Sequence, residues 1–175
     1  VLVPSFIPLK STLEALEAAE VETMVAVPAM LPFLEGACKN NDVQLPDLRY
    51  ILTGGGKLDR LLEKRIRESM HVICFEGYGL TECSPVVSCN PSEKTRKPGT
   101  VGPPLPGYEI QIRDLDKNPL GNSSEGVLWV RGPSVVAGYF NAPDLTAERF
   151  ADGWFNTGDI VRVDAVSYTH LRAHE

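Results

Sequence analysis

The sequence predicts an α/β fold in which a parallel β-sheet flanked by helices is followed by a small antiparallel, barrel-like β lobe. In the first half of the chain, short apolar runs alternate with segments whose apolar residues recur at helical spacing. This alternation is typical of parallel strands joined by crossover helices. In the second half, apolar and polar residues alternate within short segments that turn sequences separate, as in antiparallel strands.

The first helix is predicted to begin at Ser11. The segment Ser11-Thr-Leu-Glu14 matches a capping box, and apolar residues follow it at helical spacing. The apolar run 23–27 then predicts a short buried strand. Pro28 ends this strand, because a proline cannot donate a backbone hydrogen bond to a neighbouring strand.

The same alternation continues to residue 75. Residues 28–37 predict a helical turn or short helix that Pro32 disturbs. The remaining elements are a strand at 48–53, a helix at 58–70 and a strand at 71–75. Within that helix, helical spacing places four apolar side chains on one face, namely Leu58, Leu61, Leu62 and Ile66.

The second half begins with a segment rich in proline and glycine. Residues 84–107 therefore predict a long ordered loop or linker. Alternating residues predict strands near 108–112 and 127–131, joined through a turn at 116–121. A short helix near 144–150 and a turn at Asp152-Gly153 lead into a last strand near 154–160.

These elements divide the chain into an α/β part, residues 1–107, and a β lobe, residues 108–165. Residues 166–175 break the preceding pattern and resemble a translated transposase sequencing adapter, so we expect a non-native tail. A natural C-terminal peptide is the alternative. The chain also starts without an initiator methionine, which suggests that it begins within a longer protein.

Composition excludes several classes of function. The 175 residues are 43% apolar and 23% charged, as in a soluble globular protein. The net charge of −6 and the lack of a basic stripe argue against nucleic-acid binding. The four cysteines form no C-x-x-C pair, which argues against zinc and favours reduced thiols in the cytoplasm.

The segment 76–82, Glu-Gly-Tyr-Gly-Leu-Thr-Glu, carries the most informative chemistry. It is predicted to be a loop at the carboxyl end of a strand, where open α/β sheets bind ligands. Gly77 and Gly79 allow positive φ and a close approach of the backbone to a ligand. Tyr78 could stack on a purine, the alternative being a core tyrosine. Thr81 could donate to a phosphate oxygen and Glu82 could bind magnesium; singly, each could equally cap the loop.

Two other segments strengthen this hypothesis. Gly54, Gly55 and Gly56 follow a neighbouring strand and leave room for a flat base or an acyl group, the alternative being a flexible turn. Asp159 follows a turn and could accept hydrogen bonds from both ribose hydroxyls, as acidic residues do in other nucleotide-binding folds. Alone, Asp159 would be interpreted as a turn residue.

Three motifs together resemble the adenylate-forming superfamily, which includes acyl-CoA synthetases and peptide-synthetase adenylation domains. They occur in the expected order, and the resemblance covers nearly all of residues 1–165. The segment 76–85 is most similar to the bacterial long-chain fatty acyl-CoA synthetases. The motifs are Glu76-Gly-Tyr-Gly-Leu-Thr-Glu82, Gly126-Val-Leu-Trp-Val-Arg-Gly-Pro133 with Gly138-Tyr-Phe-Asn141, and Gly153-Trp-Phe-Asn-Thr-Gly-Asp159.

The resemblance implies a role for each candidate residue. Tyr78 would lie against adenine, Thr81 would contact the α-phosphate, Glu82 would hold Mg²⁺ and Asp159 would bind ribose. Thr81 and Glu82 are the catalytic candidates. The segment 126–141 would be mainly structural. The other nucleotide-binding candidates are Gly54, Gly55 and Gly56, which would border the adenine and acyl sites, and Glu76, Gly77, Gly79 and Leu80.

The activity implied by the resemblance is ATP-dependent ligation of a fatty acid to coenzyme A in the cytoplasm. The alternatives are an acyl-carrier-protein synthetase, a peptide-synthetase adenylation domain, or a fragment that only binds. The family's phosphate loop, hinge and catalytic lysine are not found in these residues, so the isolated chain is expected to be inactive. Acyl-chain length, oligomeric state and peripheral membrane association of the parent enzyme are left open.

Overall fold

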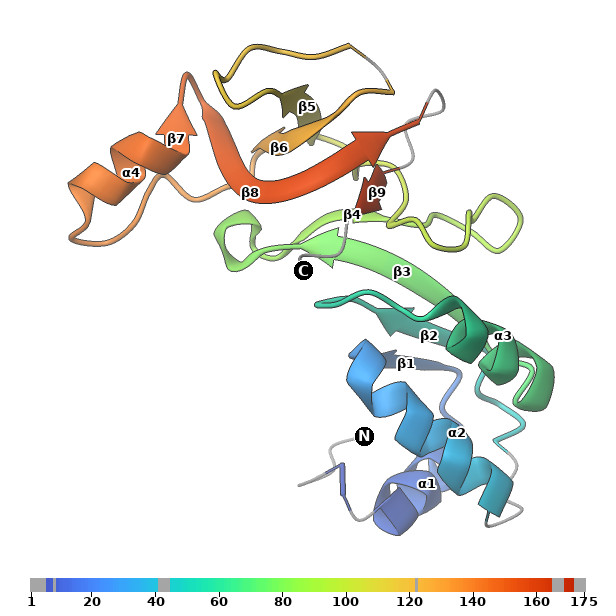
Figure 1. Cartoon of the computed structure of the whole chain (residues 1–175). Helices are drawn as coiled ribbons and strands as arrows, with labels where there is room; N and C mark the ends of the chain where they lie inside the picture. Colours follow the sequence, from blue (N-terminus) through green and yellow to red (C-terminus); the bar gives the residue numbers. More distant parts are fainter. Residues whose placement is uncertain (1–5, 8, 41–44, 122, 165–168, 172–175) are drawn as a thin grey trace. The chain divides into compact units, whose positions relative to one another are not determined.

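The computed structural model of the chain, which describes residues 6–7, 9–40, 45–121, 123–164 and 169–171, contains the predicted parallel sheet (Figure 1). Strand β1 (Thr23–Ala26) pairs with β2 (Tyr50–Thr53), and β2 pairs with the beginning of β3 (Ile73–Gly79), all in parallel. The chain divides into two units, Val1–Glu76 and Gly77–Glu175. The predicted domain boundaries stay a prediction.

Among the described residues of the first unit, three helices accompany these strands. They are α1 (Leu9–Ala18), α2 (Leu31–Asn40), which a single 3₁₀ turn η1 (Pro28–Met30) precedes, and α3 (Arg60–Ser69). Their buried side chains and the core-facing residues of the strands form one hydrophobic cluster. Its best-buried members are Leu31, Leu34, Ile51, Leu58, Ile66, Val72 and Cys74.

Helix α3 has a defined beginning. The Asp59 side chain accepts a hydrogen bond from the Leu62 amide at 2.8 Å, which satisfies one of the unpaired amides of the first turn. Leu58, Leu62 and Ile66 are buried as predicted, but Leu61 is 69% exposed. The prediction for Leu61 is wrong. The buried residues Leu58, Leu62 and Ile66 recur every four residues, and Leu61, three residues after Leu58, lies outside this buried face.

Two other predictions for the first unit also need correction. Helix α1 begins at Leu9, before Ser11, so Ser11 lies inside the helix and does not form the predicted capping box. Strand β1 is an edge strand, and Val25 is 77% exposed. The core covers only the face of the sheet that carries Ala26, so β1 is not buried on both sides.

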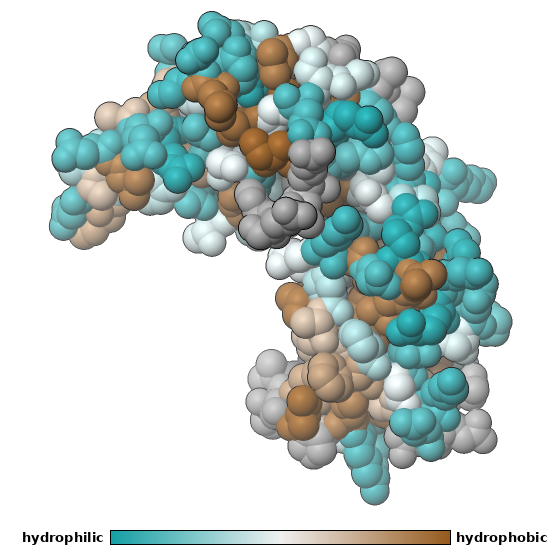
Figure 2. Space-filling view, viewed as in Figure 1, coloured by the Kyte–Doolittle hydropathy of each residue, from teal (hydrophilic) through white to brown (hydrophobic). Residues whose placement is uncertain are grey.

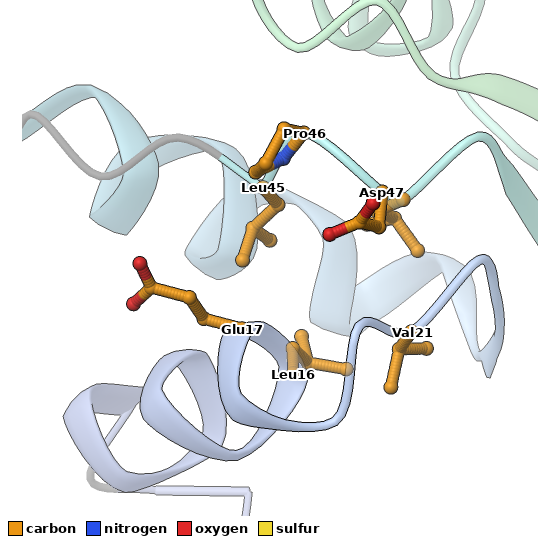
Figure 3. A pocket seen from close by; sticks show the side chains of 7 residues that line it. Leu16, Glu17, Val21, Leu45, Pro46 and Asp47 are labelled. Carbon is orange, nitrogen blue, oxygen red and sulfur yellow. The ribbon is translucent and has the colours of Figure 1, made fainter.

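Apolar side chains also reach the surface of the helices. Phe33 on α2 and Leu61 on α3 are more than half exposed, and Figure 2 shows hydrophobic atoms over this part of the surface. A shallow hollow lies between the end of α1 and residues 45–48, where Leu16 faces Leu45 (Figure 3). No helix among the described residues is long and apolar enough to span a membrane.

The second unit contains the predicted antiparallel lobe, a curled sheet that resembles half of a barrel (Figure 1). The strands are hydrogen-bonded in the order β5-β6-β8-β7, and β9 pairs with β8. A second hydrophobic cluster lies beneath them and includes Val130, Phe155 and Val161. The elements are β5 (Glu109–Arg113), β6 (Glu125–Arg131), α4 (Pro143–Arg149), β7 (Phe150–Ala151), β8 (Trp154–Val163) and β9 (Thr169–Leu171).

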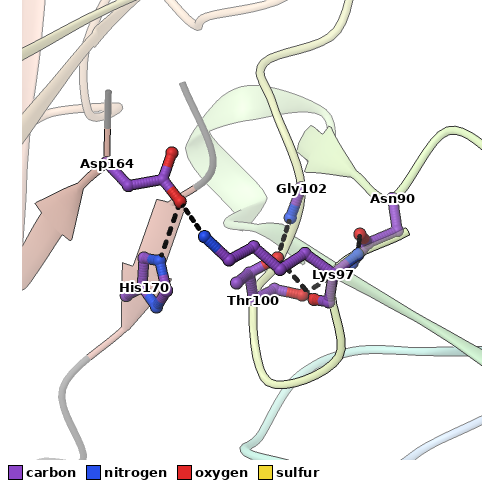
Figure 4. Close-up of polar contacts among 6 residues, drawn as sticks. All are labelled: Asn90, Lys97, Thr100, Gly102, Asp164 and His170. Atoms are coloured by element: carbon purple, nitrogen blue, oxygen red, sulfur yellow. Dashed lines mark hydrogen bonds and ion pairs between the residues drawn. The ribbon is translucent and has the colours of Figure 1, made fainter. Parts of the chain in front are cut away.

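The segment 84–107 is ordered, but it contains a strand that the sequence did not predict. β4 (Val86–Cys89) pairs antiparallel with the end of β3. Beyond it, buried Asn90 holds the loop: its amide donates to the Thr100 carbonyl at 2.6 Å and its Oδ1 accepts from the Lys97 amide at 2.9 Å (Figure 4). The Asn90 side chain thus supplies hydrogen bonds to the backbone of this loop, where no regular strand pairing among the described residues does so.

Part of the predicted non-native tail lies within the described residues. β9 pairs with β8 through Val163, Arg162 and Val161, and the Val101 amide donates to the Thr169 carbonyl at 3.0 Å. Residues 166–168 and 172–175 lie outside the described residues. The pairing of β9 involves backbone groups that any sequence supplies, so the origin of the tail stays a prediction.

The segment 76–82 differs from the predicted loop. Residues 76–79 continue strand β3, and a single 3₁₀ turn, η2 (Thr81–Cys83), follows Leu80. Neither Gly77 nor Gly79 has a positive φ. A Cβ at Gly79 would instead lie 1.9 Å from the Pro85 carbonyl oxygen. Glycine is needed here because the chain before β4 lies against β3, which the sequence alone could not reveal.

Gly79→Ala should therefore destabilise the protein by at least about 2 kcal/mol, because an overpacked site must shift its backbone. Gly36→Ala is the matched control. A Cβ at Gly36, inside α2, would meet no atom within 4 Å, and alanine in a helix is favoured by about 0.5–1 kcal/mol. Urea unfolding followed by circular dichroism measures both; equal stability of the two variants would contradict this explanation.

Candidate functional site

The structure brings two of the predicted site residues into direct contact. The Tyr78 hydroxyl, on β3, donates to Oδ2 of Asp159, on β8, with an oxygen–oxygen distance of 2.5 Å. The two residues are 81 positions apart in the chain, and both belong to the second unit. A contact over this separation places the first and last motifs at one site.

An irregularity in the pairing of β8 with β6, between Asn156 and Ile160, orients Asp159. Gly158 has a φ of +80°, a conformation that favours glycine. The Gly158 amide donates to Oδ1 of Asn156 at 3.0 Å, and the Asp159 amide donates to the Thr157 hydroxyl at 3.1 Å. The Thr157 hydroxyl in turn donates to the Leu128 carbonyl at 2.9 Å. These bonds explain why Asn, Thr, Gly and Asp occur in this order.

The Tyr78 ring is part of the second hydrophobic cluster, and the residue is only 8% exposed. The environment of the ring therefore agrees with the core-tyrosine alternative. Burial raises the pKa of the Tyr78 phenol far above its usual value, and the hydrogen bond to Asp159 raises that pKa further. The phenol thus stays a hydrogen-bond donor at physiological pH, and its predicted contact with adenine stays a prediction.

Glu82 lies in the turn η2 and is held through both its main chain and its side chain. Its backbone carbonyl accepts from the Val136 amide at 2.8 Å. Its Oε1 accepts from the Tyr139 hydroxyl at 2.7 Å. Among the described residues, none donates a hydrogen bond to the second oxygen, Oε2. The carboxylate is therefore oriented through Oε1, and Oε2 remains able to bind a ligand.

Tyr139 is a residue that the sequence did not single out, since the segment 126–141 was interpreted as structural. Its ring packs edge-on against Phe150 with centroids 5.8 Å apart. Burial, and then the hydrogen bond and negative charge of Glu82, raise the pKa of its phenol. The only sequence signal was its place in the motif Gly138-Tyr-Phe-Asn141.

The remaining residues of the first motif have different environments. Thr81 is exposed and Leu80 is half-buried, whereas Glu76 is buried. The Cys83 side chain is fully buried, and this burial together with the charge of Glu82 raises the pKa of its thiol to about 11. A protonated thiol is a poor nucleophile and metal ligand, so Cys83 has a packing role.

Gly54, Gly55 and Gly56 follow β2 in the first unit. Gly55 has a φ of +75° and is exposed. A Cβ at Gly56 would lie 3.8 Å from the Pro28 side chain, an ordinary contact. The triplet therefore requires glycine for its turn at Gly55. Its predicted place beside adenine and the acyl group stays a prediction.

The residues around Glu82 fit only one kind of magnesium site, in which a nucleotide supplies some of the ligands. Among the described residues, no three His, Cys, Asp or Glu side chains are grouped to hold a metal. Mg²⁺ in nucleotide-dependent enzymes is usually held by one or two carboxylates together with substrate phosphates and water. A single oriented carboxylate with an available oxygen suits that arrangement and not a site built from protein ligands alone.

Comparison with known proteins identifies a family that matches most of the chain. The family model described as "AMP-binding enzyme" matches residues 1–140. The long-chain-fatty-acid–CoA ligase of Yersinia pestis is 39% identical over 124 residues, which is 71% of this chain and 22% of the relative. The chain thus spans about a fifth of the length of that relative.

A second sequence relative and a solved structure are also similar to most of this chain. Luciferin 4-monooxygenase of Photinus pyralis is 32% identical over 155 residues, 87% of this chain and 28% of the relative. The N-terminal domain of FACL13 from Mycobacterium tuberculosis, an inhibitor-bound crystal structure, superposes with a TM-score of 0.85 at 27% identity. That superposition covers 99% of this chain and 43% of the other. These similarities confirm the predicted fold class.

The buried phenol of Tyr78 should make the protein sensitive to alkali. Because the folded-state pKa lies above the unfolded value, the folded chain keeps a proton that the unfolded chain releases above about pH 10. The contribution of the Tyr78 phenol to the free energy of unfolding is complete below that pH. Above it, this contribution falls by about 1.4 kcal/mol per pH unit. In Tyr78→Phe this fall in the free energy of unfolding with rising pH should be absent.

The measurement is the free energy of unfolding in urea at several pH values between neutral and about pH 11. Tyr78→Phe should be less stable than the wild type at neutral pH, because Asp159 loses a hydrogen bond. The difference between the two proteins should narrow as the pH rises. A constant difference over the whole range would show that Tyr78 ionises normally.

Proposed function

Because this chain belongs to the family of AMP-binding enzymes, we propose that its residues form part of an ATP-dependent ligase that joins a fatty acid to coenzyme A. The observation that carries the proposal is the hydrogen bond between Tyr78 and Asp159. It joins the motif proposed for adenine to the residue proposed for ribose, two groups that are directly bonded in ATP. The fatty acid as substrate rests on the similarity to the ligase of Yersinia pestis.

The proposed reaction has two steps. In the first, a carboxylate oxygen of the fatty acid attacks the α-phosphorus of ATP, the bond from that phosphorus to the bridging oxygen breaks, and pyrophosphate leaves. In the second, the sulfur of coenzyme A attacks the carbonyl carbon of the acyl-adenylate. AMP then leaves with the electrons of the broken bond, and the thiol proton is released. Energy from ATP is thus kept in a thioester.

Residues of this chain would bind and orient ATP. The Asp159 carboxylate would accept hydrogen bonds from the ribose hydroxyls. Thr81, exposed at the start of η2, would donate to an α-phosphate oxygen. Glu82 would hold Mg²⁺, which neutralises phosphate charge in phosphoryl transfers. Positioning and charge neutralisation supply most of the rate in such reactions.

The acceptor of the acyl group distinguishes the proposed function from its alternatives. A relative that matches 87% of this chain carries the name of a monooxygenase, so the shared residues serve more than one second step. A carrier-protein thiol or a peptide-synthetase module would use the same first step. Comparing coenzyme A with a phosphopantetheinylated carrier protein as acceptor in the complete enzyme separates these functions.

In the complete enzyme that carries these residues, Glu82→Gln should lower fatty-acid-dependent ATP–pyrophosphate exchange by at least about 100-fold, since losing even an outer partner of a metal site costs about 10–100-fold. Asp159→Asn should instead raise the KM for ATP by about tenfold or more, because one charged hydrogen-bond acceptor is lost. Both replacements keep an oxygen that can accept from the neighbouring tyrosine.

Glu109→Gln is the matched control for both variants. Glu109 is an exposed carboxylate on β5 that pairs with Arg131 at 2.7 Å, and its loss should leave both parameters unchanged. Wild-type exchange in Glu82→Gln would overturn the metal assignment. An unchanged KM for ATP in Asp159→Asn would overturn the ribose assignment.

The 175-residue chain alone should not form acyl-hydroxamate from ATP, a fatty acid and hydroxylamine. The resemblance assigns the phosphate loop and the catalytic lysine to segments that these residues do not contain. A Glu82→Ala variant of the same chain gives the baseline of the colorimetric assay. Turnover clearly above that baseline would refute the prediction.

A further inference from the structure

The side chain that orients Glu82 comes from a segment that the proposed function does not use. The Tyr139 hydroxyl donates to Oε1 of Glu82 at 2.7 Å. Three residues earlier, the Val136 amide donates to the Glu82 carbonyl at 2.8 Å. One short segment, residues 136–139, therefore fixes the main chain and the carboxylate of the same glutamate.

Tyr139 is itself held in place on two sides. Its amide donates to the Thr146 hydroxyl at 2.9 Å, and that hydroxyl donates to the Ala142 carbonyl at 2.9 Å. Its ring packs edge-on against Phe150, which packs on Phe155 with centroids 4.9 Å apart. Because both the backbone and the ring are fixed, the phenol oxygen has a defined position before any ligand binds.

A Cβ at Gly138 would lie 2.5 Å from the Thr146 side chain. Only glycine lets residues 138 and 139 lie so close to α4, and this closeness allows the Tyr139 amide to bond Thr146. The motif Gly138-Tyr139 is thereby explained by geometry: the glycine gives the approach and the tyrosine gives the donor.

The chemistry of the contact suits a metal ligand. A phenol donates one hydrogen bond without bringing a positive charge, so the carboxylate keeps its full negative charge while one of its oxygens is fixed. The Oε2 atom accepts no hydrogen bond from any described residue and is left for the ion. Outer partners of this kind orient metal ligands and commonly change metal affinity by about 10–100-fold.

We propose that Tyr139 is a positioning residue for magnesium binding, acting through Oε1 of Glu82. The proposal rests on the proposed function, because it assumes that Glu82 is a ligand of Mg²⁺ in the nucleotide complex. Tyr139 does not touch the substrate or the reacting atoms. Its effect should therefore appear as a change in the requirement for the metal, more than as a loss of activity when the metal is saturating.

The test uses the complete enzyme and the variant Tyr139→Phe. The Mg²⁺ concentration for half-maximal ATP–pyrophosphate exchange should rise by about tenfold or more, and saturating Mg²⁺ should restore most of the rate. A second measurement is independent of turnover: binding of Mn²⁺ in the presence of a non-hydrolysable ATP analogue, followed by electron paramagnetic resonance, should weaken by a similar factor.

Tyr108→Phe is the matched control. The Tyr108 hydroxyl donates to the Cys83 carbonyl at 2.6 Å, so this variant also loses a phenol hydrogen bond to the η2 turn but leaves the Glu82 carboxylate untouched. Its Mg²⁺ requirement and its Mn²⁺ affinity should stay at wild-type values. Thermal melting of both variants measures any common loss of stability.

The outcomes separate the two proposals. If Glu82→Gln leaves exchange and Mn²⁺ binding unchanged, Glu82 is not a metal ligand and both proposals fail. If Glu82→Gln abolishes Mn²⁺ binding while Tyr139→Phe behaves like Tyr108→Phe, only the role of Tyr139 is overturned. A loss of rate in Tyr139→Phe that saturating Mg²⁺ does not relieve would likewise show that the contact is structural.

Discussion

A partly buried hydrogen bond from the phenol of Tyr78 to the carboxylate of Asp159 connects the two halves of the candidate site. It joins β3 to β8, strands that belong to different sheets and do not pair with each other. The bond requires a donor that stays protonated, which burial of Tyr78 ensures. It also requires an acceptor in a defined position, which the positive φ of Gly158 and the hydroxyl of Thr157 provide within β8. Other features of the first and last motifs can be understood as conditions for this contact.

The same strand also explains the glycines of the first motif. At its beginning β3 has a parallel neighbour, β2, and at its end it has an antiparallel neighbour, β4. The register shifts between Tyr78 and Gly79, and there the Pro85 carbonyl approaches so closely that no side chain fits at Gly79. The glycines thus allow the chain to fold back directly after Tyr78, which places Thr81 and Glu82 in a tight turn beside it.

Local patterns in the sequence predicted what depends on local physics. Apolar spacing predicted helix α3, and alternation predicted β5 and β6. The pattern could not predict β4, because prolines and glycines dominate the segment around it and its pairing depends on the chain folding back onto β3 after Tyr78. Nor could it show that Tyr139 reaches Glu82, because that contact joins residues 57 positions apart. The motifs named the candidate site residues, but they did not single out Tyr139, which orients Glu82.

The two carboxylates proposed to bind ligand share one feature, which is that each accepts a hydrogen bond from a tyrosine. Glu82 accepts from Tyr139 and Asp159 from Tyr78. An arginine or lysine would orient a carboxylate equally well but would neutralise it and compete with a cation or with hydroxyl donors. A phenol orients the group through a hydrogen bond and adds no positive charge of its own. Since a site for a magnesium nucleotide needs anions that are held in place, the choice of an uncharged donor is itself an argument for the proposed function.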